Sequence, residues 1–127
     1  MIVVDASAAI SSLLSEGPAR RTLSADRLHA PHLIDPEIAN GIRRRVSDGR
    51  ISSDAGWRAL DTWRRLGMTR HPTISLLERI WQLRDNLSAY DASYVALAEA
   101  LGCSLLTADR RLSMAPGIEC AVTVVPR

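Results

Sequence analysis

Four acidic residues each lie where the chain is predicted to begin a helix. Asp5 directly follows the apolar run Ile2–Val4, and Asp109 follows a second apolar run at 103–106. Glu37 and Asp91 fall in the first turns of two further predicted helices. Because the carboxyl ends of parallel strands share one edge of a sheet, these four carboxylates can meet there. A divalent cation would relieve their mutual repulsion, and such an ion can activate water to hydrolyse a phosphodiester.

Each acid also has a simpler explanation in the local structure. Asp91 can complete a capping box with Ser88, and Asp109 can cap the helix that begins at Arg110. Glu37 can interact favourably with the positive end of its own helix. The recurrence of one arrangement, in which an apolar run is followed by an acid and a helix start, favours a shared site over separate caps.

The predicted elements alternate between short strands and helices. Strands are expected at Ile2–Val4, 28–30, 68–70, 103–106 and 121–125, and helices at Ala6–Leu14, 19–25, 36–46, 54–66, 74–84, 89–101 and Arg110–Met114. Gly17 and Pro18 are expected to break the first helix, and Asp35 to cap the third. This alternation predicts a single α/β domain over residues 1–127, with a central parallel sheet of about five short strands flanked by helices.

Composition excludes several classes of protein. The 127 residues are 46% apolar and 24% charged, which is ordinary for one soluble domain, and no run approaches the length of a membrane span. The opening Met-Ile-Val-Val-Asp has no basic region before its apolar residues, so we expect no signal peptide and a cytoplasmic protein. Cys103 and Cys120 are expected to be reduced, buried thiols. All 16 basic residues are arginine, which excludes any mechanism that needs a lysine amine.

Four segments of the chain resemble the motifs of one family. They are Val-Val-Asp-Ala-Ser at 3–7, Pro-Glu-Ile at 36–38, Ser-Ala-Tyr-Asp-Ala-Ser-Tyr-Val-Ala-Leu-Ala at 88–98 and Leu-Leu-Thr-Ala-Asp-Arg-Arg-Leu at 105–112. Together they resemble PIN-domain ribonucleases, in particular VapC-type toxins of bacterial toxin–antitoxin pairs, over residues 2–126. The resemblance implies a PIN-like fold and a catalytic acid tetrad of Asp5, Glu37, Asp91 and Asp109. It also implies metal-dependent cleavage of single-stranded RNA, a small antitoxin that covers the site, and a homodimer.

Within that resemblance, Asp5 and Asp91 are predicted to bind Mg²⁺ directly, with Mn²⁺ as a substitute. Glu37 and Asp109 would orient ligand waters or hold a second ion. Ser7 and Thr107 are neighbouring polar helpers, and Thr107 is also a candidate contact to the substrate.

Arginines near the acids are candidates for holding the RNA backbone. Arg43 and Arg44 follow Glu37 on the same predicted helix, and Arg111 follows Asp109. A solvated charged face is an equally open reading of these side chains.

The three tryptophans, Trp57, Trp63 and Trp81, are expected to pack in the interior rather than to stack on bases. For Trp57 and Trp63 an interface role stays open. The antitoxin is expected in an apolar groove around residues 34–66.

Other α/β proteins with clusters of acids at strand ends fit these residues less well. A response-regulator receiver domain needs a lysine, and a haloacid-type phosphatase needs an aspartate at the position of Ser7. His29 and His32 could suggest zinc, but Pro31 interrupts the segment between them and they would not share a helix face. A catalytically inactive PIN-like module that binds RNA or protein stays open as the alternative function.

Overall fold

The core of the protein is one parallel sheet. The computed structural model describes residues 1–15 and 18–126. Its strands are β1 (Ile2–Val4), β2 (Leu28–Pro31), β3 (Met68–His71), β4 (Ser104–Thr107) and β5 (Val122–Val124), arranged in the order β3-β2-β1-β4-β5 with every pair parallel. Because β2 and β4 lie on opposite sides of β1, the order reverses at β1, the point where open α/β sheets bind ligands. The predicted fold class is confirmed.

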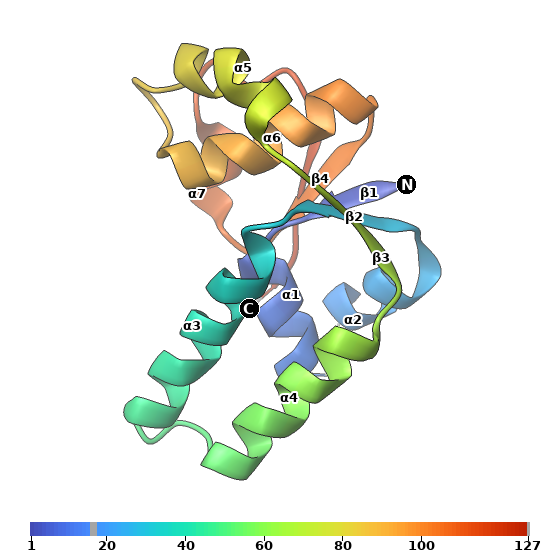
Figure 1. Cartoon of the computed structure of the whole chain (residues 1–127), viewed down its shortest axis with the longest axis vertical. Helices are drawn as coiled ribbons and strands as arrows, with labels where there is room; N and C mark the ends of the chain where they lie inside the picture. Colours follow the sequence, from blue (N-terminus) through green and yellow to red (C-terminus); the bar gives the residue numbers. More distant parts are fainter. Residues whose placement is uncertain (16–17, 127) are drawn as a thin grey trace.

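Helices cover both faces of this sheet, as Figure 1 shows. Drawn below the strands are α1 (Ala6–Leu14), α2 (Pro18–Ala25), α3 (Ile34–Ser47) and α4 (Ser53–Arg65). Above them lie α5 (Leu77–Gln82), which follows the 3-10 turn η1 (Ile74–Leu76), α6 (Ala89–Leu101) and α7 (Arg110–Met114). β1 and the neighbouring β4 are therefore covered on both faces of the sheet, which explains why these two strands have no polar alternation.

The helix ends follow the local chemistry of the sequence. Asp5, Ser52, Ser88 and Asp109 each cap a helix through the side chain. Gly102 ends α6 in the left-handed conformation at φ 66°, which glycine adopts without steric penalty. The predicted cap at Asp35 is wrong, because α3 already begins at Ile34. The break expected at Gly17 lies outside the described residues.

Asp35 instead joins three elements. Its carboxylate accepts a hydrogen bond of 2.8 Å from Trp63 Nε1 on α4, and bonds of 2.7 and 2.9 Å from the Arg70 guanidinium on β3. The hydrogen-bonded Arg70 holds the pKa of the Asp35 carboxyl below its ordinary value. This contact fixes the α3–α4 pair against the edge of the sheet.

The tryptophans do not all pack in the interior as predicted. Trp63 is buried, whereas Trp57 and Trp81 are 57% and 67% exposed. In the segment 74–84 the buried apolar residues are Leu76, Ile80 and Leu83, while Ile74, Leu77 and Trp81 face solvent. Both sets have helical spacing, so periodicity alone could not decide which set packs inward.

Two further expectations concern the burial of the two cysteines and the absence of a membrane-spanning segment. Cys103 and Cys120 are free thiols, but the prediction that they are buried is wrong, because both are only partly buried. None of the helices in residues 1–15 and 18–126 combines the length and the apolar run that a membrane crossing requires.

Replacing Asp35 by alanine should destabilise the fold. The Trp63 indole N–H would lose its acceptor in the interior, which costs about 1–3 kcal/mol. Because the pKa of Asp35 is lowered in the folded state, its ion pair contributes above the ordinary carboxyl pKa and is lost as pH falls through the folded value. Urea unfolding at pH 7 and pH 3 should therefore show a smaller difference between variant and wild type at the lower pH.

Asp61→Ala is the matched control, since within the part of the chain that the structure describes Asp61 pairs with Arg64 and Arg65 on the surface of its own helix. It should change the unfolding midpoint little. If Asp35→Ala were as stable as this control, the three-way contact would not hold the elements together.

Candidate active site

Asp5 lies at the carboxyl end of β1 and is almost completely buried, with 6% of the residue exposed. Its Oδ1 accepts hydrogen bonds from the Ala8 amide at 2.9 Å and the Ser7 hydroxyl at 2.7 Å. The Thr107 hydroxyl, at the end of β4, donates to Oδ2 at 2.5 Å. Burial raises the pKa of the Asp5 carboxyl despite these donors, and the negative charge of Asp91 adds to the rise. These donors hold the ionised carboxylate in position, but they do not fully offset the free-energy cost of burying its charge.

Ser7 and Thr107 also connect Asp5 to the chain that leads into α7. The Ala108 amide donates to Ser7 Oγ at 2.9 Å, and the Asp109 amide donates to Thr107 Oγ1 at 3.0 Å. Thr107 is fully buried, so its role differs from the substrate contact predicted from sequence. Its hydroxyl orients Asp5 and ties the ends of β1 and β4 together.

Glu37 points from the first turn of α3 into the same region, and a tyrosine on α6 holds it. The Tyr94 hydroxyl donates to Glu37 Oε1 at 2.5 Å, while the tyrosine ring is buried in the core. Burial raises the pKa of Glu37, and the charges of Asp91 and Asp5 raise it further. The pKa of Tyr94 is raised by burial and by the bond to Glu37, so its hydroxyl stays protonated as a donor.

Asp91 and Asp109 form the more open side of the site. Asp91 lies in the first turn of α6, where its amide donates to Ser88 Oγ. Partial loss of water around the Asp91 carboxyl raises its pKa, and the charge of Asp109 raises it further. Asp109 accepts from the Arg111 amide at 3.0 Å and is ion-paired with the Arg111 guanidinium at 3.2 Å. Arg111 thus neutralises Asp109 in this structure.

The four acids are coupled electrostatically. Asp91 acts on the pKa of both Asp5 and Glu37, and Asp109 acts on that of Asp91. Three raised carboxyl pKa values and an all-oxygen donor set suit a hard cation such as Mg²⁺. Across the described ranges, no three acidic, histidine or cysteine side chains already enclose a common point.

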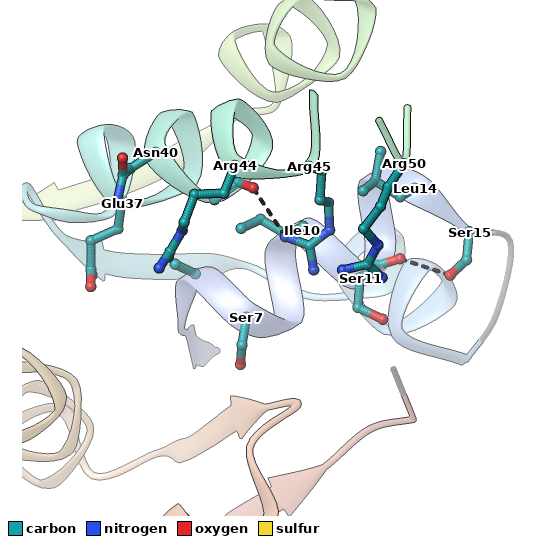
Figure 2. Close-up of a pocket in the computed structure, with 12 residues that line it drawn as sticks. Ser7, Ile10, Ser11, Leu14, Ser15, Glu37, Asn40, Arg44, Arg45 and Arg50 are labelled. Atoms are coloured by element: carbon teal, nitrogen blue, oxygen red, sulfur yellow. Dashed lines mark hydrogen bonds between the residues drawn. The ribbon is translucent and has the colours of Figure 1, made fainter. Parts of the chain in front are cut away.

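The candidate substrate-binding arginines separate into two environments. Arg44 lines a groove next to Glu37, together with Arg45 and Arg50, as Figure 2 shows. Arg43 is exposed, and its guanidinium donates to Asn40 at 2.9 and 3.0 Å. The groove places Arg44, but not Arg43, beside an acid of the site.

Sequence reasoning missed three features here. Tyr94 has the spacing of a residue on the apolar face of its helix, so its spacing does not mark it as a site residue, although a buried tyrosine hydroxyl usually has a hydrogen-bond partner. Nothing in the sequence marks Arg45 and Arg50 as site residues, because only the fold brings α1 opposite them. His29 bonds to His71 across β2 and β3, at 2.9 Å between ring nitrogens, rather than pairing with His32.

Comparisons with known proteins agree with this geometry. The family model of the PIN domain matches residues 2–117. The chain is 61% identical over its full length, and over the full length of its relative, to the protein named ribonuclease VapC9 of Mycobacterium tuberculosis. It is 42% identical to ribonuclease VapC1 of the same species, over 97% of this chain and 96% of that protein.

A solved structure extends the likeness to the fold. The crystal structure of PAE2754 from Pyrobaculum aerophilum superposes with a TM-score of 0.73 at 26% identity, covering 95% of this chain and 81% of that one. Motifs, sheet order and relatives agree: the chain belongs to the PIN-domain family and is of its VapC type.

Proposed function

We propose that this chain is the toxin of a toxin–antitoxin pair and acts as a Mg²⁺-dependent endoribonuclease on single-stranded regions of RNA. The observation that carries the proposal is the coupled group of Asp5, Glu37 and Asp91, whose carboxyl pKa values are all raised at the switch point of the sheet. Groups with perturbed pKa values cluster at functional sites. Relatives at 61% and 42% identity that are named ribonucleases support the same reaction class.

In this proposal Asp5 and Asp91 hold the cation, with Mn²⁺ as an alternative to Mg²⁺. When bound, the ion supplies a water of lowered pKa and offsets negative charge on the scissile phosphate. The remaining residues position the ligands. Thr107 and Ser7 orient Asp5, Tyr94 orients Glu37, and Glu37 accepts a proton from the attacking water or fixes its direction.

Asp109 completes the tetrad once it releases Arg111. The side chain of Arg111 is 90% exposed, and its guanidinium lies 3.2 Å from Asp109, which is long for a charged pair. A phosphate can therefore displace Asp109 from Arg111 without removing the arginine from a buried position. Arg111 would then contact the substrate, and Asp109 would be available to orient water in the site.

Two protein partners are part of the proposal. The exposed Trp57 on α4, over which the Arg64 guanidinium lies, supports an antitoxin surface on the α3–α4 pair. The exposed set Ile74, Leu77 and Trp81 on η1 and α5 supports a homodimer surface, because a set of large apolar side chains on one face favours association.

Free Cys103 and Cys120 support a reducing compartment, the cytoplasm.

Asp91→Asn should abolish RNA cleavage while leaving the fold intact. Loss of groups that merely orient metal ligands lowers activity about 10- to 100-fold, so loss of a direct ligand should lower it by at least about 100-fold. The measurement is cleavage of a single-stranded RNA pool with Mg²⁺, with circular dichroism as the check on folding. Sequencing of the RNA ends would also identify the cleaved sequence.

Asp85→Asn is the matched control, because Asp85 is an exposed acid in the turn before α6. It should cleave at the wild-type rate. Full Mg²⁺-dependent activity in Asp91→Asn would contradict the assignment, and absence of cleavage in the wild type would favour an inactive binding module.

Trp57→Arg and Trp81→Arg should separate the two partner surfaces. Trp57→Arg should lose binding of the proposed antitoxin and keep the dimer, whereas Trp81→Arg should become a monomer and keep the antitoxin. Light scattering of each variant, alone and with the antitoxin, measures both. A dimer in Trp81→Arg, or an intact antitoxin complex in Trp57→Arg, would reject the respective surface.

A further inference from the structure

A groove of about 530 Å³ leads away from the acid site between α1 and α3. Both helices begin next to the site, at Ala6 and Ile34, and run outward from it. Ser7 and Glu37 line the inner end of the groove, and Ser15 and Arg50 line its outer end. Any chain that occupies the groove therefore extends directly into the acid site.

One wall of the groove is cationic. Arg44 and Arg45 from α3 and Arg50 from the following loop point toward α1, as Figure 2 shows. Arg45 donates to the Gly41 carbonyl, at 3.1 Å. The guanidinium groups of Arg44 and Arg50 have no hydrogen bond or ion pair within residues 1–15 and 18–126. Glu37 is the one acid among the described lining residues, and Arg44, Arg45 and Arg50 are the cationic ones.

The floor of the groove is apolar and narrow. Ile10 and Leu14 of α1 line it, and Gly41 of α3 comes so close that an added Cβ would lie 2.4 Å from Ile10 Cδ1. The helices thus meet beneath the groove and close it from below. A cationic wall above an apolar floor suits a polymer with anionic linkages and flat, apolar faces.

We propose that a single strand of RNA lies in this groove, with successive phosphates on Arg44 and Arg50 and its bases against Leu14. The inference rests on the proposed function and adds the path of the substrate to it. Arginine binds phosphate through paired N–H donors, and RNA is recognised with its bases accessible mainly where it is single-stranded. The groove delivers the next phosphate along the strand to Asp5, Glu37 and Asp91.

The test is binding of a fluorescein-labelled single-stranded RNA, measured by anisotropy in EDTA so that cleavage does not interfere. The doubly substituted Arg44→Ala/Arg50→Ala chain is compared with Arg58→Ala/Arg65→Ala, which removes the same charge from exposed positions outside the groove. Each single-strand phosphate contact contributes about 0.7 to the slope of log affinity against log salt. The groove variant should bind at least about tenfold more weakly, with a slope reduced by about 1.4.

One further arm separates this inference from the proposed function. Hydrolysis of bis(p-nitrophenyl) phosphate with Mn²⁺ by the wild type reports on the acid site without an RNA strand in the groove. If the wild type did not hydrolyse this substrate, the proposed nuclease activity would be contradicted. The RNA affinities of the variants would still test the path of RNA in the groove.

Equal affinity and salt slope in the two double variants would overturn the inference, as would absence of RNA binding by the wild type. A polyglutamate peptide provides the last comparison. If the groove variant lost the peptide but kept the RNA, the groove would belong to an acidic protein segment, and the inference would again be overturned.

Discussion

The site depends on keeping one carboxylate, that of Asp5, buried between the ends of two neighbouring strands. An ionised carboxylate without donors is too costly to bury, so the surrounding chain must supply them. The Ala8 amide comes from the helix that Asp5 itself caps, the Ser7 hydroxyl from the same turn, and the Thr107 hydroxyl from β4. These bonds require β1 and β4 to be adjacent and parallel, with Val4 opposite Leu106. The sheet order that places β1 beside β4 is therefore also what forms the site around Asp5.

The other acids are placed by the helices that this order brings to the same edge. Tyr94 reaches from α6 to hold Glu37 on α3, and Asp91 faces both from the first turn of α6. The raised pKa values mean that each ionised carboxylate costs folding free energy at neutral pH. That cost falls as pH is lowered through the raised pKa, or when a cation binds. In the proposed function, this loss of stability accompanies the capacity to bind metal and phosphate.

Much of this could be read from the sequence because the governing signals are local. A strand followed by an acid and a helix start fixes Asp5 and Asp109 at strand ends, and first-turn positions fix Glu37 and Asp91. What could not be read depends on contacts between distant segments. Asp35 has the sequence features of a helix cap, but its partners are 28 and 35 residues away at Trp63 and Arg70.

The same limit explains the remaining differences. Both apolar sets in the segment 74–84 fit a helix, and packing against α6 selected the one with Leu76 and Ile80. Likewise, Arg43 and Arg44 are indistinguishable as neighbours in sequence, and only the position of α1 makes Arg44 a groove residue.

The central claim is that separate strand and helix ends form one cation-binding site, and metal-linked stability tests it most directly. Thermal unfolding of the wild type and of Asp91→Asn would be measured with and without Mn²⁺. At about ten times its dissociation constant, an ion that binds only the folded chain stabilises it by roughly 1.4 kcal/mol. The account predicts this gain for the wild type and a clearly smaller gain for the variant. Equal responses would mean that the acids serve as separate helix caps and do not form one site.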